Sequence, residues 1–261
     1  MAKKSEHISE LKSKLNEIKN KGYIPATRKG NTAIGKTLED CLDKEEDNKP
    51  EADFHDIEIK GKRKGSKSPV TLFTKSPTFP EQANSILKDN YGVKKDNDSE
   101  KKIHTTVKAT KFNSFKGKNG FKLEVDRENE RINILVKDIK TDTIVEKNIG
   151  YDFKNLKQIF EDKIKNLAVV SAATKKTPEG EMFHFQDGDI YSGANFDKFL
   201  KLVEEGKIQT DIRIGEYSDG RTHDHGTAFR IKPENIKDMY DSHESLDDEN
   251  LEDKDLDKEK K

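Results

Sequence analysis

Apolar side chains recur at helical spacing in four stretches of the chain. An amphipathic helix places such residues three and four positions apart. This pattern predicts helices over residues 6–20, 32–46 and 153–165, and a shorter one from Phe196 to Val203 that ends at Gly206.

Strands are predicted where apolar residues alternate with polar ones or form short continuous runs. In residues 56–62, Ile57 and Ile59 alternate with Glu58 and Lys60. The run LAVVSAA at 167–173 is apolar throughout, as in a strand covered on both faces. The other predicted strands span 70–74, 103–112, 121–126, 131–137, 143–147, 182–185, 208–217 and 227–232. Without an internal repeat, this order predicts a single α/β domain over residues 1–240, built on a mixed β-sheet flanked by helices.

Composition narrows the class of protein. Charged residues make up 39% of the 261 residues and hydrophobic ones 30%. No apolar run approaches the ~20 residues of a membrane span, and the charged N-terminus lacks the apolar region of a secretory signal. The single cysteine, Cys41, cannot form an internal disulfide. We therefore expect a cytoplasmic protein without membrane contact, and neither a disulfide scaffold nor a cysteine-based zinc finger.

The formal net charge of -1 conceals an asymmetry between the two parts of the chain. Residues 241–261 hold ten acidic residues and four lysines, whereas the other 240 residues hold 46 basic and 41 acidic ones. With only three leucines to bury, Leu246, Leu251 and Leu256, the acidic tail over 241–261 is predicted to be disordered. The mildly basic body permits a nucleic-acid partner without requiring one.

Residues 30–37, GNTAIGKT, match the phosphate-loop pattern G-x-x-x-x-G-K-[ST]. A nucleotide-binding loop follows a buried apolar strand, but the residues before this one contain Pro25 and several cationic side chains. An NTPase is therefore a remote alternative, and we expect no nucleotide cofactor. Arg28, Lys29 and Lys36, together with amides at a helix N-terminus, are expected to hold a nucleic-acid backbone instead.

A second candidate site lies in ADFHDIEIK, where Glu58 and Lys60 share one face of a predicted strand and Asp53 precedes it. Two converging carboxylates can hold Mg²⁺ through oxygen, and a lysine beside them can stabilise an attacking hydroxide. The pattern D-x(n)-E-x-K is typical of metal-dependent nucleases. In so charged a chain, a solvated strand face with an ion pair is the commoner explanation of such spacing. The core-facing isoleucines and the cationic loop beyond favour the functional interpretation.

A third candidate site lies in TDIRIGEYSDGRTHDHGTAFRI, residues 210–231. Two histidines spaced H-x-H on a strand could bind a metal, but without cysteines or a clear third ligand a zinc site is the weaker interpretation. Arginine pairs with guanine and aspartate accepts from cytosine in the major groove. The candidate readers of G·C pairs are Asp211, Arg213, His223, Asp224, His225 and Arg230, with an ordinary ion-paired surface as the alternative.

Five ordered segments of the chain carry a family resemblance. RKGNTAIGKTLED, DFHDIEIK, SPVTLFTKSP, DIRIG and THDHGTAFRI resemble the MvaI/BcnI group of type II restriction endonucleases, related in fold to the mismatch-repair nickase MutH. The resemblance spans about residues 20–232 and implies a restriction-endonuclease-like PD-(D/E)XK core. It implies a catalytic part over about 20–175 and a DNA-recognition part over about 176–232. Asp53, Glu58 and Lys60 would form the active site, Asp53 and Glu58 would hold Mg²⁺, and Glu39 would support them.

The resemblance also implies a substrate and partners. It implies cleavage of double-stranded DNA at CC-N-GG sites, and its MvaI branch favours CCWGG, with W for A or T. The products would carry 5′-phosphate and 3′-hydroxyl ends. The enzyme would act as a monomer in the bacterial cytoplasm beside a cognate DNA methyltransferase. Two alternatives stay open: a MutH-like nickase that needs a partner, and a DNA-binding protein that has lost catalysis.

Overall fold

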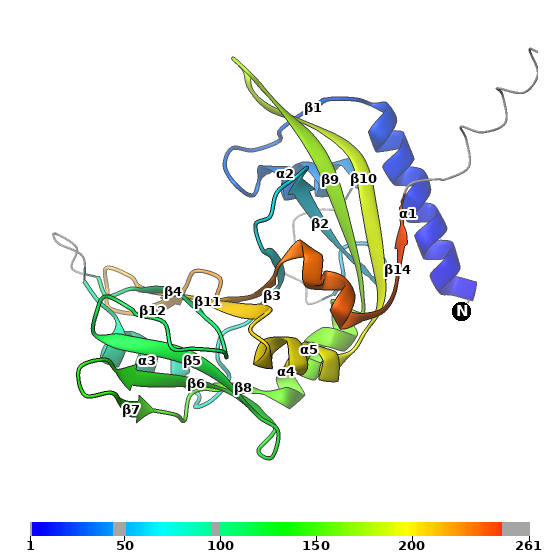
Figure 1. Ribbon diagram of the computed structural model, residues 1–261. Helices are drawn as coiled ribbons and strands as arrows, with labels where there is room; N and C mark the ends of the chain where they lie inside the picture. The colour runs from blue at the N-terminus through cyan, green and yellow to red at the C-terminus, as the bar shows by residue number, and fades with distance from the viewer. Residues whose placement is uncertain (1, 44–50, 95–99, 247–261) are drawn as a thin grey trace, which may run out of the picture. The chain divides into compact units, whose positions relative to one another are not determined.

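The computed structural model describes residues 2–43, 51–94 and 100–246 (Figure 1). The chain divides into two compact units. The first unit comprises 1–66, 162–193 and 241–261, and the second comprises 67–161 and 194–240. The chain passes between the two units four times, so each unit is assembled from segments that are far apart in the sequence.

The first unit is built on a mixed sheet in the order β1-β10-β9-β2, with β14 paired to β10. β2 runs parallel to β9, whereas β10 is antiparallel to β9 and β1. Helices α1 and α2 share one apolar core with these strands, in which Leu15 and Leu38 meet Ile59 and Phe185. The elements are α1 (Ala2–Asn20), β1 (Ile24–Pro25), α2 (Ala33–Cys41), β2 (Ile57–Arg63), β9 (Asn166–Thr177), β10 (Gly180–Ala194) and β14 (Tyr240–Ser245).

The second unit holds two further sheets among the described residues. One has the order β12-β11-β13-β3 with β4 on β11, and the other the order β5-β6-β7 with β8 on β6. Their strands are β3 (Val70–Thr74), β4 (Ile103–Val107), β5 (Asn119–Asp126), β6 (Arg131–Asp138), β7 (Thr143–Glu146), β8 (Gly150–Asp152), β11 (Ile208–Glu216), β12 (Thr222–Asp224) and β13 (Ala228–Ile231). The helices are α3 (Ala83–Tyr91), α4 (Phe153–Asp162), α5 (Phe196–Glu204) and the 3-10 helix η1 (Pro233–Met239). Phe73 lies at the centre of the core, against Phe160, Phe199 and Phe229.

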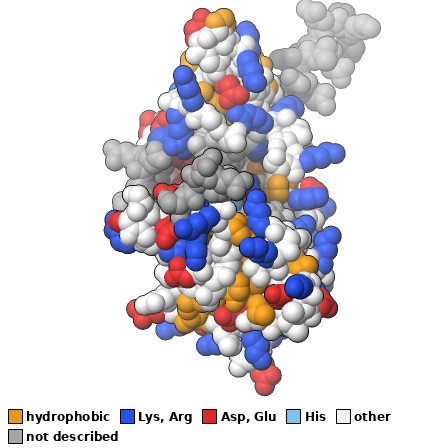
Figure 2. All heavy atoms as spheres, turned by 90° about the vertical axis from the view of Figure 1, so that its left-hand side faces the viewer, with side chains coloured by type: hydrophobic (Ala, Val, Ile, Leu, Met, Phe, Trp, Pro, Cys, Tyr) orange, Lys and Arg blue, Asp and Glu red, His pale blue; other side chains and the backbone are white. Residues whose placement is uncertain are grey.

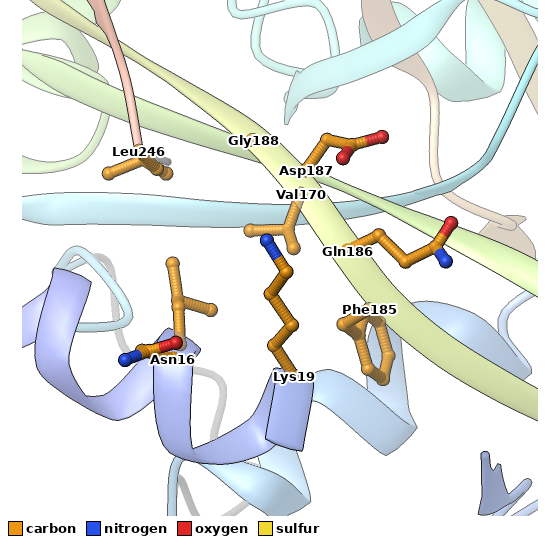
Figure 3. Close-up of a pocket in the computed structure, with 9 residues that line it drawn as sticks. Asn16, Lys19, Val170, Phe185, Gln186, Asp187, Gly188 and Leu246 are labelled. Atoms are coloured by element: carbon orange, nitrogen blue, oxygen red, sulfur yellow. The ribbon is translucent and has the colours of Figure 1, made fainter. Parts of the chain in front are cut away.

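The prediction of a disordered tail from residue 241 is wrong for residues 241–246. Most side chains of β14 are exposed, so its apolar content gave no signal, but its backbone pairs with β10. Leu246 is buried, and its amide donates to the carbonyl oxygen of Gly188 at 2.8 Å. It lines a cavity of about 30 Å³ between α1 and β10, room for a water molecule or two (Figure 3). The rest of the tail, 247–261, lies outside the described residues.

None of the helices that the structure describes is both long and apolar enough to cross a membrane.

Candidate active site and nucleic-acid interface

Strand β2 carries the central carboxylate of the first candidate site. The Glu58 side chain is fully buried, and Lys60, two residues along the strand, donates to its Oε1. Ile57 and Ile59 point into the core, as predicted. A solvated strand face would leave Glu58 exposed, so the structure does not support that alternative.

A tight turn before β2 brings Asp53 to the same place. Phe54 and Ile57 exchange two backbone hydrogen bonds of 2.9 and 2.8 Å, and His55 between them has a left-handed φ of 52°. The turn folds the chain back, so that Asp53 Oδ2 accepts from the amide of Ile59 at 3.1 Å. Asp53 is therefore held against the strand that carries Glu58.

The charges of the site act on one another. Burial raises the pKa of the Glu58 carboxyl, and the negative charge of Asp53 adds to the rise. Burial alone would lower the pKa of Lys60, but the carboxylates of Glu58 and Asp53 raise it. Glu39 on α2 also has a raised pKa, first through burial and then through Asp53. The four predicted catalytic residues thus form one electrostatic cluster.

Lys163 is a member of this site that sequence reasoning missed. Its Nζ lies 3.3 Å from Glu58 Oε2, the oxygen that Lys60 leaves free of a hydrogen bond. The residue lies between α4 and β9 and has no motif around it. The parallel pairing of β2 with β9, in which Ile57 faces Asn166, brings it to the site. A contact of this kind depends on sheet topology and leaves no local signal.

The donor set of the site fits a hard divalent cation. Glu58 Oε2 is buried and accepts no hydrogen bond, and carboxylate oxygens are what Mg²⁺ prefers. Within the described ranges, no group of three or more His, Cys, Asp or Glu side chains is placed to hold a metal. Asp53 and Glu58 are the carboxylates that would hold such an ion, and Mg²⁺ is commonly bound through one or two protein carboxylates.

The cationic segment around α2 packs directly on the active-site strand. A Cβ at Gly61 of β2 would lie 3.1 Å from the carbonyl oxygen of Ile34, so glycine allows the close approach. The buried hydroxyl of Thr37 donates to Ala33 O at 2.8 Å and accepts from the amide of Thr27 at 3.1 Å, which ties the preceding loop to the helix. Lys36 pairs with Asp40 at 2.5 Å.

Two of the predicted backbone-binding residues lie close to the active site. Arg28 and Lys36 act on Glu39 and oppose the rise of its pKa. Lys29 lies in the exposed turn before α2. The strand that precedes the loop, β1, is two residues long and only partly buried. It is not the long buried strand that a nucleotide-binding phosphate loop follows.

The predicted base-reading residues lie in the second unit, on the sheet around β11. Ile212 and Ile214 are buried in the core. On the opposite face Asp211 Oδ2 accepts from Arg230 Nη1 at 2.7 Å and lies 3.7 Å from Arg213 Nη2. As predicted, Asp211 and Arg213 share a face.

Arg230 is held at two points. Besides its bond to Asp211, its Nη2 donates to the carbonyl oxygen of Pro69 at 2.9 Å. Its Nε is buried without a hydrogen-bond partner. Thr106 completes the arrangement by donating to the other oxygen of Asp211 at 2.7 Å. The plane of the guanidinium group is therefore fixed.

Asp224 has a different environment from Asp211. Its Oδ1 accepts from the amides of Gly226 and Thr227 at 2.7 and 2.6 Å. Its Oδ2 accepts from Ser76 Oγ at 2.7 Å and from Asn84 Nδ2 at 3.2 Å. Since each carboxylate oxygen offers about two acceptor positions, the protein itself fills them. Asp224 shapes the turn that follows β12.

The two histidines of the H-x-H pattern lie side by side, with ring centroids 4.3 Å apart. The ring of His225 lies over Gly215, where an added Cβ would be only 2.4 Å from Nε2. The ring of His223 is held by a 2.6 Å hydrogen bond between its Nδ1 and the Tyr217 hydroxyl. The pair thus continues the row of Asp211 and Arg213 along β11.

Asp53, Glu58, Lys60 and Glu39 belong to the first unit and all six predicted base-reading residues to the second. Figure 2 shows one face of the molecule, on which Lys and Arg side chains are scattered among acidic ones. The two clusters of candidate site residues are therefore a better guide to function than the overall charge of this face.

Comparisons with known proteins agree with this arrangement. A model of the MvaI/BcnI restriction endonuclease family matches residues 12–240. Restriction endonuclease MvaI in complex with its cognate DNA substrate is 36% identical, with a TM-score of 0.85, and the match covers 93% of this chain and 99% of that one. MvaI in the absence of DNA is 35% identical, with a TM-score of 0.63 and coverage of 93% and 98%. No curated protein matches the chain.

The fold and the site define a type II restriction enzyme, a site-specific deoxyribonuclease that binds double-stranded DNA. The chain belongs to the MvaI/BcnI restriction endonuclease family. The predicted family and the predicted restriction-endonuclease-like fold are both confirmed. Enzymes of this kind generally use divalent metal ions.

Proposed function

We propose that the protein is a Mg²⁺-dependent endonuclease that recognises CCWGG and leaves 5′-phosphate and 3′-hydroxyl ends. The observation that carries the catalytic part is the fully buried Glu58 beside Asp53 and Lys60, with one carboxylate oxygen that accepts no hydrogen bond. An inactive DNA-binding protein would have no need of so costly a buried charge. The resemblance to the MvaI branch supports the CCWGG site.

Asp53 and Glu58 would hold the cation, and Glu39 would add negative charge beside them. A bound Mg²⁺ would supply a lower pKa for an attacking water and charge for the phosphate oxygens. The ammonium of Lys60, which donates to Glu58, would orient that water and stabilise the hydroxide that forms from it. Arg28, Lys29 and Lys36 would contact the DNA backbone near the site and fix the register of the duplex.

Base reading falls to the row along β11 and β13. Arg230 and Arg213 would donate to guanine O6 and N7, and His223 and His225 would complete the major-groove contacts. Asp211 already accepts hydrogen bonds from Arg230 and Thr106, so only its remaining acceptor positions could serve a base. Asp224 acts indirectly, because the turn that it organises carries His225. The enzyme would work as a monomer in the bacterial cytoplasm, with a cognate methyltransferase that protects the host sites.

The test is digestion of a plasmid of known sequence with Mg²⁺, followed by mapping of every end. Cuts at CCWGG and at no CCSGG site (S for G or C) are expected. Cuts at CCSGG sites would instead give the chain the specificity of the other branch of its family, with a central G·C pair. Cleavage that requires an added partner protein would favour the MutH-like alternative.

The catalytic assignment is tested on the same DNA. Glu58→Gln and Lys60→Ala are each expected to lower the cleavage rate at least about a hundredfold, since each removes a group that stabilises the transition state. Specific binding in a gel-shift assay should persist, because the base-reading residues belong to the other unit. Wild-type turnover in both variants would refute the assignment.

A further inference from the structure

Glu58 meets two ammonium groups, one at each carboxylate oxygen. Lys60 hydrogen-bonds Oε1, whereas Lys163 lies 3.3 Å from Oε2 without a hydrogen bond to it. The two lysines therefore differ in how they are held. Lys60 is part of strand β2 and fixed by its hydrogen bond, whereas Lys163 follows α4 and lies outside any strand or helix. About a quarter of each side chain is exposed.

The two roles that Oε2 can serve exclude each other. A buried carboxylate needs a counter-charge, and Lys163 supplies one where a divalent cation would bind. Two cations cannot share that oxygen, because their repulsion at about 4 Å in a partly buried site is strong enough to change binding tenfold or more. With its partial exposure, the Lys163 side chain has a path to solvent.

We propose that Lys163 is a positioning residue that occupies the metal side of Glu58 in the metal-free protein and leaves when the divalent cation enters. The inference rests on the proposed active site and adds a regulated step to it. Lys163 sets a threshold for metal loading and keeps Glu58 neutralised until the cation arrives.

Calcium binding to the full chain without DNA, measured by isothermal titration calorimetry at neutral pH and fixed salt, tests this without turnover. Lys163→Gln and the near-isosteric Lys163→Met are each expected to bind Ca²⁺ about tenfold or more tightly than the wild type. Lys165→Gln, which removes the same charge from an exposed position two residues on, is the matched control and should stay within twofold.

Unchanged or weaker binding in the Lys163 variants, or no binding in any variant, would overturn the inference. The double variant Glu58→Gln/Lys163→Gln distinguishes a failure of the inference about Lys163 from a failure of the proposed active site. If it binds no Ca²⁺ while Lys163→Gln binds tightly, both the site and the role of Lys163 are supported. If it still binds, the cation lies elsewhere, and the proposed active site and the inference both fall.

Discussion

Asp211 and Asp224 are both acidic residues in a segment predicted to read bases, yet their surroundings assign them different tasks. Asp211 pairs with Arg230 on the neighbouring strand, and the guanidinium plane is set by that bond. Asp224 accepts four hydrogen bonds from its own unit. Residue type alone therefore predicts too many base-reading residues. The number of acceptor positions that the protein itself fills shows which carboxylates have capacity left for a base.

Asp224→Asn is expected to lower the free energy of unfolding by about 1.5–3 kcal/mol at pH 7, the usual worth of hydrogen bonds to a charged group. Burial would raise the pKa of Asp224, but hydrogen bonds from Ser76, Thr227 and Gly226 outweigh it and the pKa is lowered. An acid with a lowered folded-state pKa stabilises the fold above its unfolded value, 3.8, and loses that contribution below it. Urea unfolding at pH 7, 5 and 3.5 should therefore show a difference between the two proteins that is constant from pH 7 to 5 and begins to shrink at the lowest pH.

Asp187→Asn is the control for this comparison, because Asp187 forms an exposed ion pair with Lys64. Its effect should stay within about 1 kcal/mol. A stable Asp224→Asn protein that loses discrimination at one base pair would mean that Asp224 contacts a base itself.

Arg230→Ala is expected to cost about 1–3 kcal/mol in binding to the cognate site and much less on random DNA. The fixed plane of Arg230 suits a bidentate contact, and Arg230→Lys, which keeps the charge but not the fork, should lose nearly as much specific affinity. Competition gel shifts on both DNAs make the measurement. Equal losses on the two DNAs would show that Arg230 contacts phosphate or serves the fold.

At the scale of elements, hydrophobic periodicity predicted those helices and strands in which apolar residues recur at a regular spacing. The strand over 70–74 is confirmed, and α1, β2 and β11 lie where their patterns predict them, with shifted ends. The helix predicted over 32–46 is confirmed as Ala33–Cys41, and residues 44–46 lie outside the described ranges. The strand predicted over 103–112 ends at Val107.

The missed elements lack such a period. Strands β1, β8 and β12 are two or three residues long, which is too short to show an alternation. Helix α3 buries Ala83, Leu87 and Lys88, and a lysine on the buried face hides the apolar stripe. Lys88 is tolerated there because it pairs with Glu216 at 3.3 Å and donates to Gly220 O at 3.0 Å. Lys88 and its partners are far apart in the sequence, as are Lys163 and Glu58, so local patterns do not reveal these contacts.

The loop before α2 is an element whose motif admits two interpretations, and one variant separates them. Lys36→Ala is expected to weaken binding to cognate and random DNA equally, because a phosphate contact carries no base information. The slope of log K against log salt should become shallower by about one charge. ATP and GTP should leave cleavage unchanged.

Salt titrations of DNA binding, with Lys19→Ala on α1 as the control, make this comparison. The control removes one lysine from an exposed position of the same unit and should leave the slope nearly unchanged. Hydrolysis of free ATP, or cleavage stimulated by nucleotide, would instead restore the phosphate-loop interpretation.

On the scale of the whole molecule, the residues proposed for catalysis and those proposed for base reading belong to different units of one chain. The described residues hold one Asp53–Glu58–Lys60 set, in the first unit, and one row of candidate base readers, in the second. The sequence has no internal repeat that could supply another. If these assignments hold, one chain carries a single catalytic centre with its own reading surface, which is what the proposed monomer requires.

A monomer with one catalytic centre must first nick one strand. It must then release the DNA, or reorient on it, before it cuts the other strand. The proposed site, CCWGG, departs from two-fold symmetry at its central pair, so one chain would bind it in either orientation. A dimer would instead place two centres on the duplex and cut both strands in one encounter. A time course on supercoiled plasmid with one site, at several enzyme concentrations, is expected to show open circles before linear DNA and a rate first order in enzyme. Linear product that forms directly, with a second-order rate, would make a dimer the active species.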